Sequence, residues 1–384
     1  MTLPNSKPRL AIIMTGGGAR AAYQIGVLKA IGELLEKGAP SPFTIICGTS
    51  AGAINAAGLA AGADRYHVAV RRLNFIWSNF TSNQVFRSDL PGIAKTGAHW
   101  LLTMMLGGLG KHGPMYLLDR QPLRKLLEQY LDSAVFQASI EAGALDALCV
   151  STSGYSSHQS VSFFQGRPEL SNWKRAQRIG FASRITIDHL MASSAIPFLF
   201  KPEKINREYF GDGSMRQTAP ISPALHLGAE RILIIGNRME RVAEPQRISN
   251  PDFPTLGEIA GHALDSIFLD SLDADIERLQ RINRTIQLIA DDDKEKHGIT
   301  LRQVDVQVIY PSQDLGELAQ LHTHELPWTL RTLMRGMGAY SKTNSSFISY
   351  LLFERGYCNA LIDLGYQDTI NMRGEIELFL TGNI

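Results

Sequence analysis

Short apolar runs that end in glycine and lead into helical patterns constrain the fold of this chain most. The first two are RLAIIM (9–14) and FTIICG (43–48). A run of this length bounded by glycine is typical of a strand that is covered on both faces. Apolar residues then recur on one face of a predicted helix that Gly38 ends, namely Tyr23, Val27, Ile31, Leu34 and Leu35.

The same alternation of strands and helices continues along the chain. Apolar segments predict further strands at 145–155, 160–166, 230–237 and 304–310, and the segment 120–131 has helical spacing. Such alternation favours an α/β layer fold with a largely parallel central sheet.

A long amphipathic helix is predicted over residues 264–289. Its apolar side chains form one stripe, and its acidic residues precede its basic residues, which is the order that the helix dipole favours. We expect this helix to pack on the sheet or on another subunit. The segment 51–61 is mostly alanine and glycine, so it predicts a helix that depends on close packing against a sheet.

Composition argues against several classes of protein. With 384 residues the chain can form one large domain or two smaller ones, and its formal net charge of +1 offers no basic surface for nucleic acid. The widely separated Cys47, Cys149 and Cys358 indicate buried free thiols in a reducing compartment. We find neither a signal-peptide pattern nor an apolar run of the ~18 residues that cross a bilayer, and therefore expect a cytoplasmic protein.

The stretch GTSAG (48–52) predicts a nucleophilic serine. Ser50 lies between an apolar strand and a predicted helix, with Gly48 and Gly52 on either side. A hydroxyl that stands clear of a sheet needs a sharp, strained turn, and the flanking glycines remove side chains that would collide there. The helix N-terminus also favours negative charge near Ser50.

An acyl-transfer site also needs hydrogen-bond donors for the oxyanion. Gly16, Gly17 and Gly18 follow the first strand and open a helix, where unpaired N–H groups are accessible to a substrate oxygen. A dinucleotide-binding loop is the alternative, because Gly16, Gly18 and Ala21 fit the pattern G-x-G-x-x-A. That pattern requires an acidic residue near the end of the second strand, and the chain has none there, so we prefer the oxyanion interpretation.

Asp212 is the predicted base for this serine. It lies in a tight Asp-Gly turn after a short aromatic strand, although such turns also occur without any catalytic role. A hydrolase triad would place its histidine later in the chain, as His226 or His262. Both of these lie in helical stretches, and we interpret them as structural.

Four segments together resemble the patatin-like phospholipase family of the bacterial type, over about residues 8 to 240. GGGARAAYQIGVLKAI resembles its glycine-rich block, GTSAG its nucleophile elbow, MASSAIPFLFKP (191–202) its Ser-x-Ala-x-Pro segment and DGS (212–214) its Asp-Gly-Gly/Ala motif. The resemblance implies a three-layer α/β/α fold with a mostly parallel central sheet. It also implies lipid acyl hydrolysis by a Ser–Asp dyad through an acyl-enzyme, without a catalytic histidine.

The resemblance assigns roles to particular positions. Ser50 is the implied nucleophile and Asp212 the implied base, while Gly16, Gly17 and Gly18 form the oxyanion loop and Arg20 stabilises it. No cofactor or metal ion is expected. The acidic run at 291–298 lacks the ligand spacing of a calcium loop and predicts a solvated turn.

Two positions depart from the family pattern. Ala21 stands where the family usually has glycine, and Ser214 stands where glycine or alanine is usual. Both side chains are small, so we expect the site to form. The Ser214 hydroxyl is expected to hydrogen-bond Asp212 and to lower its basicity.

The remaining expectations concern membrane contact and domain organisation. HWLLTMMLGGLG (99–110) predicts a lid or interfacial helix along the acyl channel, with a plain core helix as the alternative, and a transient peripheral contact at the inner membrane surface. Residues 8–240 are expected to form the catalytic domain. Residues 241–384 are expected to form a mostly helical extension on the same core, with one added strand near 304–310. Its tail, 349–380, could close the core, mediate self-association or contact lipid.

The function predicted from these observations is hydrolysis of fatty-acyl esters of phospholipids or lysophospholipids. A soluble-ester esterase or a transacylase could use the same dyad. An inactive lipid-binding scaffold is the alternative outside the enzymes, but such a scaffold needs neither Ser50 nor Asp212 nor the glycine loop. The sequence indicates no nucleic-acid partner and does not predict the oligomeric state.

Overall fold

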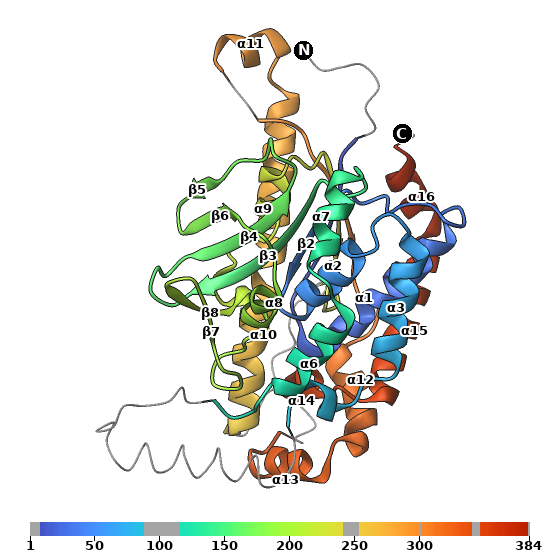
Figure 1. Cartoon of the computed structure of the whole chain (residues 1–384), viewed down its shortest axis with the longest axis vertical. Helices are drawn as coiled ribbons and strands as arrows, with labels where there is room; N and C mark the ends of the chain where they lie inside the picture. Colours follow the sequence, from blue (N-terminus) through green and yellow to red (C-terminus); the bar gives the residue numbers. More distant parts are fainter. Residues whose placement is uncertain (1–7, 88–115, 241–252, 299–300, 340–345, 383–384) are drawn as a thin grey trace.

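A central β-sheet organises the protein, for which a computed structural model describes residues 8–87, 116–240, 253–298, 301–339 and 346–382 (Figure 1). Within these residues the sheet has ten strands. Five of them pair in parallel in the order β10-β9-β1-β2-β3, namely β1 (Leu10–Met14), β2 (Ile45–Thr49), β3 (Ala147–Gly154), β9 (Arg231–Ile235) and β10 (Asp305–Ile309). Their carboxyl ends therefore meet at one edge of the sheet.

The other strands extend the sheet beyond β3. β4 (Ser160–Gly166) is antiparallel to β3, and β6 (Arg178–Ala182) and β5 (Trp173–Arg175) follow it. β8 (Glu208–Asp212) pairs with the last residues of β3 and with β7 (Glu203–Ile205). The strand at 160–166 and the short strand before Asp212 were predicted, but their antiparallel pairing with β3 and the strands β5 to β7 were not. The sheet is mostly parallel, as expected.

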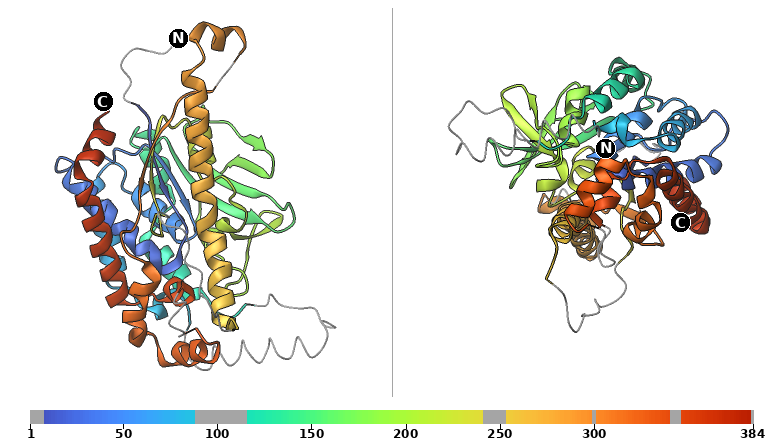
Figure 2. Two further views of the ribbon diagram at one scale, coloured as in Figure 1. Left: turned by 180° about the vertical axis from the view of Figure 1, so that it is seen from behind. Right: turned by 90° about the horizontal axis from the view of Figure 1, so that it is seen from below.

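Side chains alternate between the two faces of the sheet and create two cores. In β1, Leu10, Ile12 and Met14 belong to one apolar cluster, whereas Ala11 and Ile13 belong to the other. Helices α1 (Ala22–Glu33), α2 (Ala51–Ala60), α3 (Tyr66–Ser78) and α15 (Arg355–Asn371) contribute to the first cluster. Helices α9 (Ser222–His226) and α10 (Leu256–Gln287) contribute to the second, and Leu264 and Phe268 of α10 also join the first. The long helix α10 runs along the sheet (Figure 2). The predicted arrangement of helices on both faces of the sheet is confirmed.

The predicted long helix is α10, which packs on the sheet through residues such as Leu272 and Leu279. It begins at Leu256, earlier than the apolar pattern suggested, because Thr255 and Glu258 form a capping box at its N-terminus. The Thr255 N–H donates to Glu258 Oε2 over 2.7 Å, and the Glu258 N–H donates to Thr255 Oγ1 over 3.2 Å. The acidic run after it forms the short helix α11 (Asp291–Lys296) rather than only a turn.

The remaining helices surround this frame. They are α4 (Ser82–Val85), α6 (Gln121–Tyr130), α7 (Ala134–Glu141), α8 (Ile187–Ser193), α12 (Leu315–His322), α13 (Trp328–Gly336), α14 (Ser346–Leu351), α16 (Arg373–Thr381) and the short 3₁₀ helices Gly18–Ala21, Gly213–Arg216 and Thr323–Glu325. Among the described residues, no helix has the length and apolar content that crossing a membrane requires. The predicted lid at 99–110 lies outside the described residues.

The C-terminal segment closes the first core. Helix α15 lies against α1 so closely that a Cβ on Gly26 would be 1.9 Å from the Ile362 carbonyl oxygen. A Cβ on Gly365 would be 2.2 Å from the Tyr23 carbonyl oxygen. The Tyr23 hydroxyl also donates a 2.9 Å hydrogen bond to Asp368. Of the three roles considered for the tail, packing on the core is therefore the one observed.

Candidate active site

Ser50 occupies the turn between β2 and α2 in a strained backbone conformation. Its φ of 55° and ψ of −129° lie where side chains other than glycine are uncommon. A Cβ on Gly48 would be 2.5 Å from the Gly52 carbonyl oxygen, and a Cβ on Gly52 would be 2.2 Å from that of Met14. Both flanking positions therefore have no room for a side chain, which is the physical reason for glycine on each side of Ser50.

Ser50 and Asp212 form a direct hydrogen bond. The Ser50 hydroxyl donates to Asp212 Oδ2 over 2.6 Å, and the two side chains are almost fully buried. Asp212 reaches this position because it ends β8, which pairs with Thr152 at the end of β3. The following Gly213 is required there, because its Cβ would be 2.2 Å from the Ser151 carbonyl oxygen. Residues far apart in the sequence thus meet at one edge of the sheet.

Burial raises the pKa of Asp212 to about 6. Hydrogen bonds from the Ser50 hydroxyl and from the Ser214 N–H (3.0 Å) oppose this shift, as do the Ser214 hydroxyl and the Arg120 charge. The Ser214 hydroxyl therefore lowers the pKa of Asp212, as predicted from the sequence. A carboxylate with a pKa near 6 is ionised at neutral pH and is a better proton acceptor than an exposed one.

The glycine loop lies beside this pair. Gly18 and Ser50 line the same cavity, and no described residue accepts a hydrogen bond from the N–H of Gly17 or Gly18. Asn237 donates to the Gly16 carbonyl oxygen and Gln24 donates to that of Thr15 over 2.8 Å. These two bonds fix the peptide groups of Thr15 and Gly16 at the start of the loop. The N–H groups of Gly17 and Gly18 that follow remain available to a ligand.

The segment 191–196 contacts both members of the pair. The Ser193 hydroxyl accepts a 2.9 Å hydrogen bond from the Ser50 N–H and donates to the Ser151 carbonyl oxygen over 2.6 Å. The Asp212 N–H donates to the Ala195 carbonyl oxygen over 3.0 Å. The Ser-x-Ala-x-Pro resemblance included this segment, but no role for Ser193 was predicted from it.

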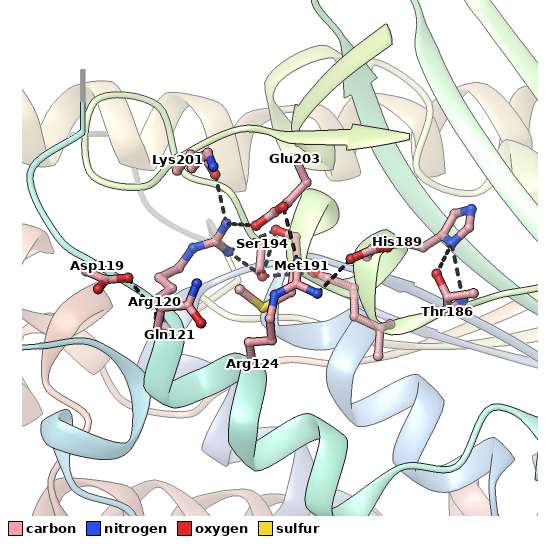
Figure 3. A network of polar contacts seen from close by, with 12 residues as sticks. Asp119, Arg120, Gln121, Arg124, Thr186, His189, Met191, Ser194, Lys201 and Glu203 are labelled. Atoms are coloured by element: carbon pink, nitrogen blue, oxygen red, sulfur yellow. Dashed lines mark hydrogen bonds and ion pairs between the residues drawn. The ribbon is translucent and has the colours of Figure 1, made fainter. Parts of the chain in front are cut away.

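Buried Arg120 holds the same segment (Figure 3). Its Nη1 donates to the Met191 carbonyl oxygen over 2.9 Å and to the Ser194 hydroxyl over 3.0 Å, and its Nη2 donates to the Lys201 carbonyl oxygen over 3.0 Å. Glu203 lies 3.8 Å from Nη2. No pattern in the sequence distinguished this arginine from the others, because its partners come from a distant segment.

Neither histidine considered for a triad takes part in this pair. His226 stacks on Trp173 with ring centroids 4.9 Å apart, and His262 is exposed on α10. Neither hydrogen-bonds Ser50 or Asp212.

Arg20 lies close to the glycine loop but is bonded to α14, as described below. The catalytic roles of all these residues remain predictions.

Ser50 lines an apolar cavity. Helices α2, α3 and α6 form most of its wall, and the polar side chains in the lining are those of Ser50, Arg72, Arg120, Tyr130, Ser194 and Tyr350. Small residues in α2 and at its end, namely Ala51, Gly58 and Ala61, also line the cavity. The other apolar lining residues are Ile54, Leu73, Ile76, Trp77, Phe80, Val85, Leu123, Leu126, Leu127, Leu131, Ile196, Phe200 and Phe353.

The chain matches the family Patatin-like phospholipase over residues 12–225, more than half of its length, and it belongs to this family. No curated protein matches the chain significantly.

Solved structures with a similar fold include VipD from Legionella pneumophila (11% identity, TM-score 0.36), the type III effector protein ExoU (15%, 0.38) and human GIVD cytosolic phospholipase A2 (12%, 0.45). These alignments cover 96%, 97% and 97% of this chain. The chain spans 67%, 54% and 60% of the length of those proteins, respectively.

A pH dependence follows from the pKa of Asp212. As the predicted base, Asp212 must be ionised to accept a proton, so kcat/KM with a soluble ester is expected to rise with a midpoint near pH 6 and to level off above it. Replacing Ser214 by alanine removes a hydroxyl that lowers this pKa, so the midpoint is expected to move upward by less than about one unit. A rate profile from pH 4.5 to 9 for both proteins measures this. A lower midpoint in Ser214→Ala than in wild type would contradict the proposed effect of the Ser214 hydroxyl on the pKa of Asp212.

Proposed function

We propose that the protein is a serine lipid acyl hydrolase that cleaves fatty-acyl esters of phospholipids or lysophospholipids. The observation that carries the proposal is the 2.6 Å hydrogen bond from Ser50 to Asp212 in the wall of an apolar cavity. Membership in the patatin-like phospholipase family supports it. A cavity of this kind suits a fatty-acyl chain, and because Ser50 lines it, an ester bound there would lie next to the serine.

The reaction would proceed in two halves. Asp212 accepts the Ser50 hydroxyl proton as the oxygen attacks the ester carbonyl, and N–H groups of the Gly16–Gly18 loop stabilise the oxyanion. The tetrahedral intermediate collapses, and the proton passes to the departing alcohol, which leaves an acyl group on Ser50. Water then attacks this acyl-enzyme with Asp212 as base, releases the fatty acid and restores the Ser50 hydroxyl.

The site would operate within one folding unit. We propose that residues 8–240 form the catalytic domain and that the extension at 241–384 packs on the same core, which the α1–α15 contact supports. Because phospholipids are held in bilayers, we also propose a peripheral encounter with a membrane surface. Exposed aromatic side chains such as Phe198 and Trp328 are of the type that enters a lipid interface.

Hydrolysis of mixed phospholipid vesicles by wild type and by Ser50→Ala tests the proposal. Mass spectrometry is expected to detect free fatty acid and lysophospholipid with wild type alone. Turnover restricted to short soluble esters would indicate an esterase, and transfer of the acyl group to an added alcohol would indicate a transacylase. Absence of turnover together with absence of fluorophosphonate labelling would favour a lipid-binding scaffold and would reject the proposal.

Filling the cavity is expected to change the preference for acyl length. Ile54 lies one turn after Ser50 on α2 and lines the cavity, so Ile54→Trp should exclude long chains while short chains still reach the serine. The ratio of kcat/KM for sixteen-carbon to four-carbon esters is expected to fall by about tenfold or more. Val68→Trp, at an exposed position on α3, provides the matched control. An unchanged ratio in Ile54→Trp would place the acyl chain elsewhere.

A further inference from the structure

Arg20, at the end of the glycine loop, is held almost entirely by residues from the C-terminal part of the chain. Its Nε donates to the Ser349 hydroxyl over 2.7 Å, its Nη1 donates to the Tyr350 hydroxyl over 3.2 Å and its Nη2 donates to the Ser346 hydroxyl over 3.3 Å. Asp265 on α10 lies 3.6 Å from Nη1. These partners all lie outside the segment that matches the family.

Tyr350 makes the most extensive of these contacts. The Arg20 guanidinium carbon lies 4.1 Å from the centre of the Tyr350 ring, and the Tyr350 hydroxyl donates to Asp265 over 2.8 Å while it accepts from Arg20. The ring also stacks on Phe268 at 5.1 Å. Since Tyr350 is fully buried, its hydroxyl is fixed by these partners rather than by solvent.

The same residue contacts the glycine loop through its main chain. A Cβ on Gly18 would be 2.2 Å from the Tyr350 carbonyl oxygen, and Gly18 has a φ of +56°, a conformation that favours glycine. Phe268, the stacking partner of Tyr350, would be 2.9 Å from a Cβ on Gly16. The loop is therefore enclosed on this side by Tyr350 and Phe268. Gly18, Ser50 and Tyr350 all line one cavity.

We infer that Tyr350 is a positioning residue of this active site, which fixes the oxyanion loop through Arg20 and through its contact with Gly18. The inference rests on the proposed function and extends it, because it makes the C-terminal extension a necessary part of the catalytic site. Tyr350 does not touch the reacting atoms. It acts by limiting where the N–H groups of Gly17 and Gly18 point, and a displacement of about 1 Å in such groups can reduce a rate by about a hundredfold.

The substitution Tyr350→Phe tests this inference, because it keeps the ring and removes only the hydroxyl that bridges Arg20 and Asp265. We expect kcat for a short soluble ester and the rate constant of fluorophosphonate labelling at Ser50 to fall by about tenfold or more. KM is expected to stay within about twofold, because the apolar wall of the cavity is retained. Tyr366→Phe, which removes a hydroxyl on α15 that bonds Glu33, is the matched control.

Combination with Arg20→Lys separates positioning from general stability. Lysine cannot reproduce the planar fork of arginine, so Arg20→Lys should slow labelling, and the double variant should be no slower than the slower single variant. A Tyr350→Phe protein with a lower melting temperature but a wild-type labelling rate per folded molecule would overturn the inference. If Tyr350→Phe does not fold, Ser349→Ala removes the acceptor of Nε and must show the same loss of kcat at constant KM. Lack of labelling in wild type would instead overturn the proposed function and, with it, this inference.

Discussion

Replacement of Asp212 by asparagine is expected to reduce kcat by a factor of about a hundred to ten thousand and leave the fold intact. The amide cannot accept the Ser50 proton, which removes the contribution of the general base. Its geometry still suits the site, because the amide oxygen can accept from the Ser214 N–H and the NH₂ group can donate to Ser50 Oγ. Steady-state kinetics with a soluble ester measures the loss. A variant with wild-type kcat would contradict the proposed dyad.

The same variant is expected to be more stable than wild type, increasingly so as the pH rises. Burial gives Asp212 a pKa of about 6 in the folded protein, against about 3.9 when unfolded, so wild type loses stability as the pH rises through this window. Asparagine does not titrate. The difference in free energy of unfolding between variant and wild type should therefore grow by roughly 1 kcal/mol from pH 5 to pH 7.5.

Urea denaturation at both pH values measures this difference. Asp363→Asn, at an exposed position on α15, serves as the control for the loss of a carboxylate that is not buried. A difference that shrinks with rising pH would contradict the assigned burial of Asp212.

The largest expected effect on stability comes from Gly26→Ala in α1. A Cβ at this position would lie 1.9 Å from the Ile362 carbonyl oxygen and 2.7 Å from the Tyr366 N, so α1 and α15 must separate. Backbone atoms cannot move aside as a flexible side chain can, and overpacking of this kind costs about 3 kcal/mol or more. We expect a melting temperature lower by several degrees and an easily cleaved C-terminal segment, measured by calorimetry and limited proteolysis.

Gly32→Ala in the same helix is the matched control. Its Cβ would meet no atom closer than 3.4 Å, in the Tyr66 ring, so the substitution should stabilise α1 by up to about 1 kcal/mol. Equal effects of the two substitutions would mean that the α1–α15 contact does not hold the C-terminal segment on the core.

Local patterns in the sequence predicted the parts of the site that depend on neighbouring residues. Ser50 was recognisable because the glycines at 48 and 52 are required by contacts within a short stretch, and Asp212 because a glycine must follow it. The strands β1, β2, β3 and β9 were recognisable because each is a short apolar run covered on both faces.

Long-range contacts account for what was not predicted. Ser193, Arg120 and Asn237 contact the site through bonds that join distant segments, and nothing in the residues around them indicates these partners. Tyr350 is a further example, because an isolated tyrosine in an apolar segment usually packs in a core. The strands β5, β6 and β7 are short and partly exposed, so they lack the apolar pattern that identified the other strands.

The most direct test of the proposed function is whether Ser50 becomes acylated during turnover. The protein is mixed with excess long-chain ester, quenched with acid within one turnover, digested and examined by tandem mass spectrometry. The proposal predicts an added acyl group on Ser50 in the wild-type protein and in no peptide of Ser50→Ala. Fatty acid released at equal rates by both proteins, with no acyl group on Ser50, would contradict it.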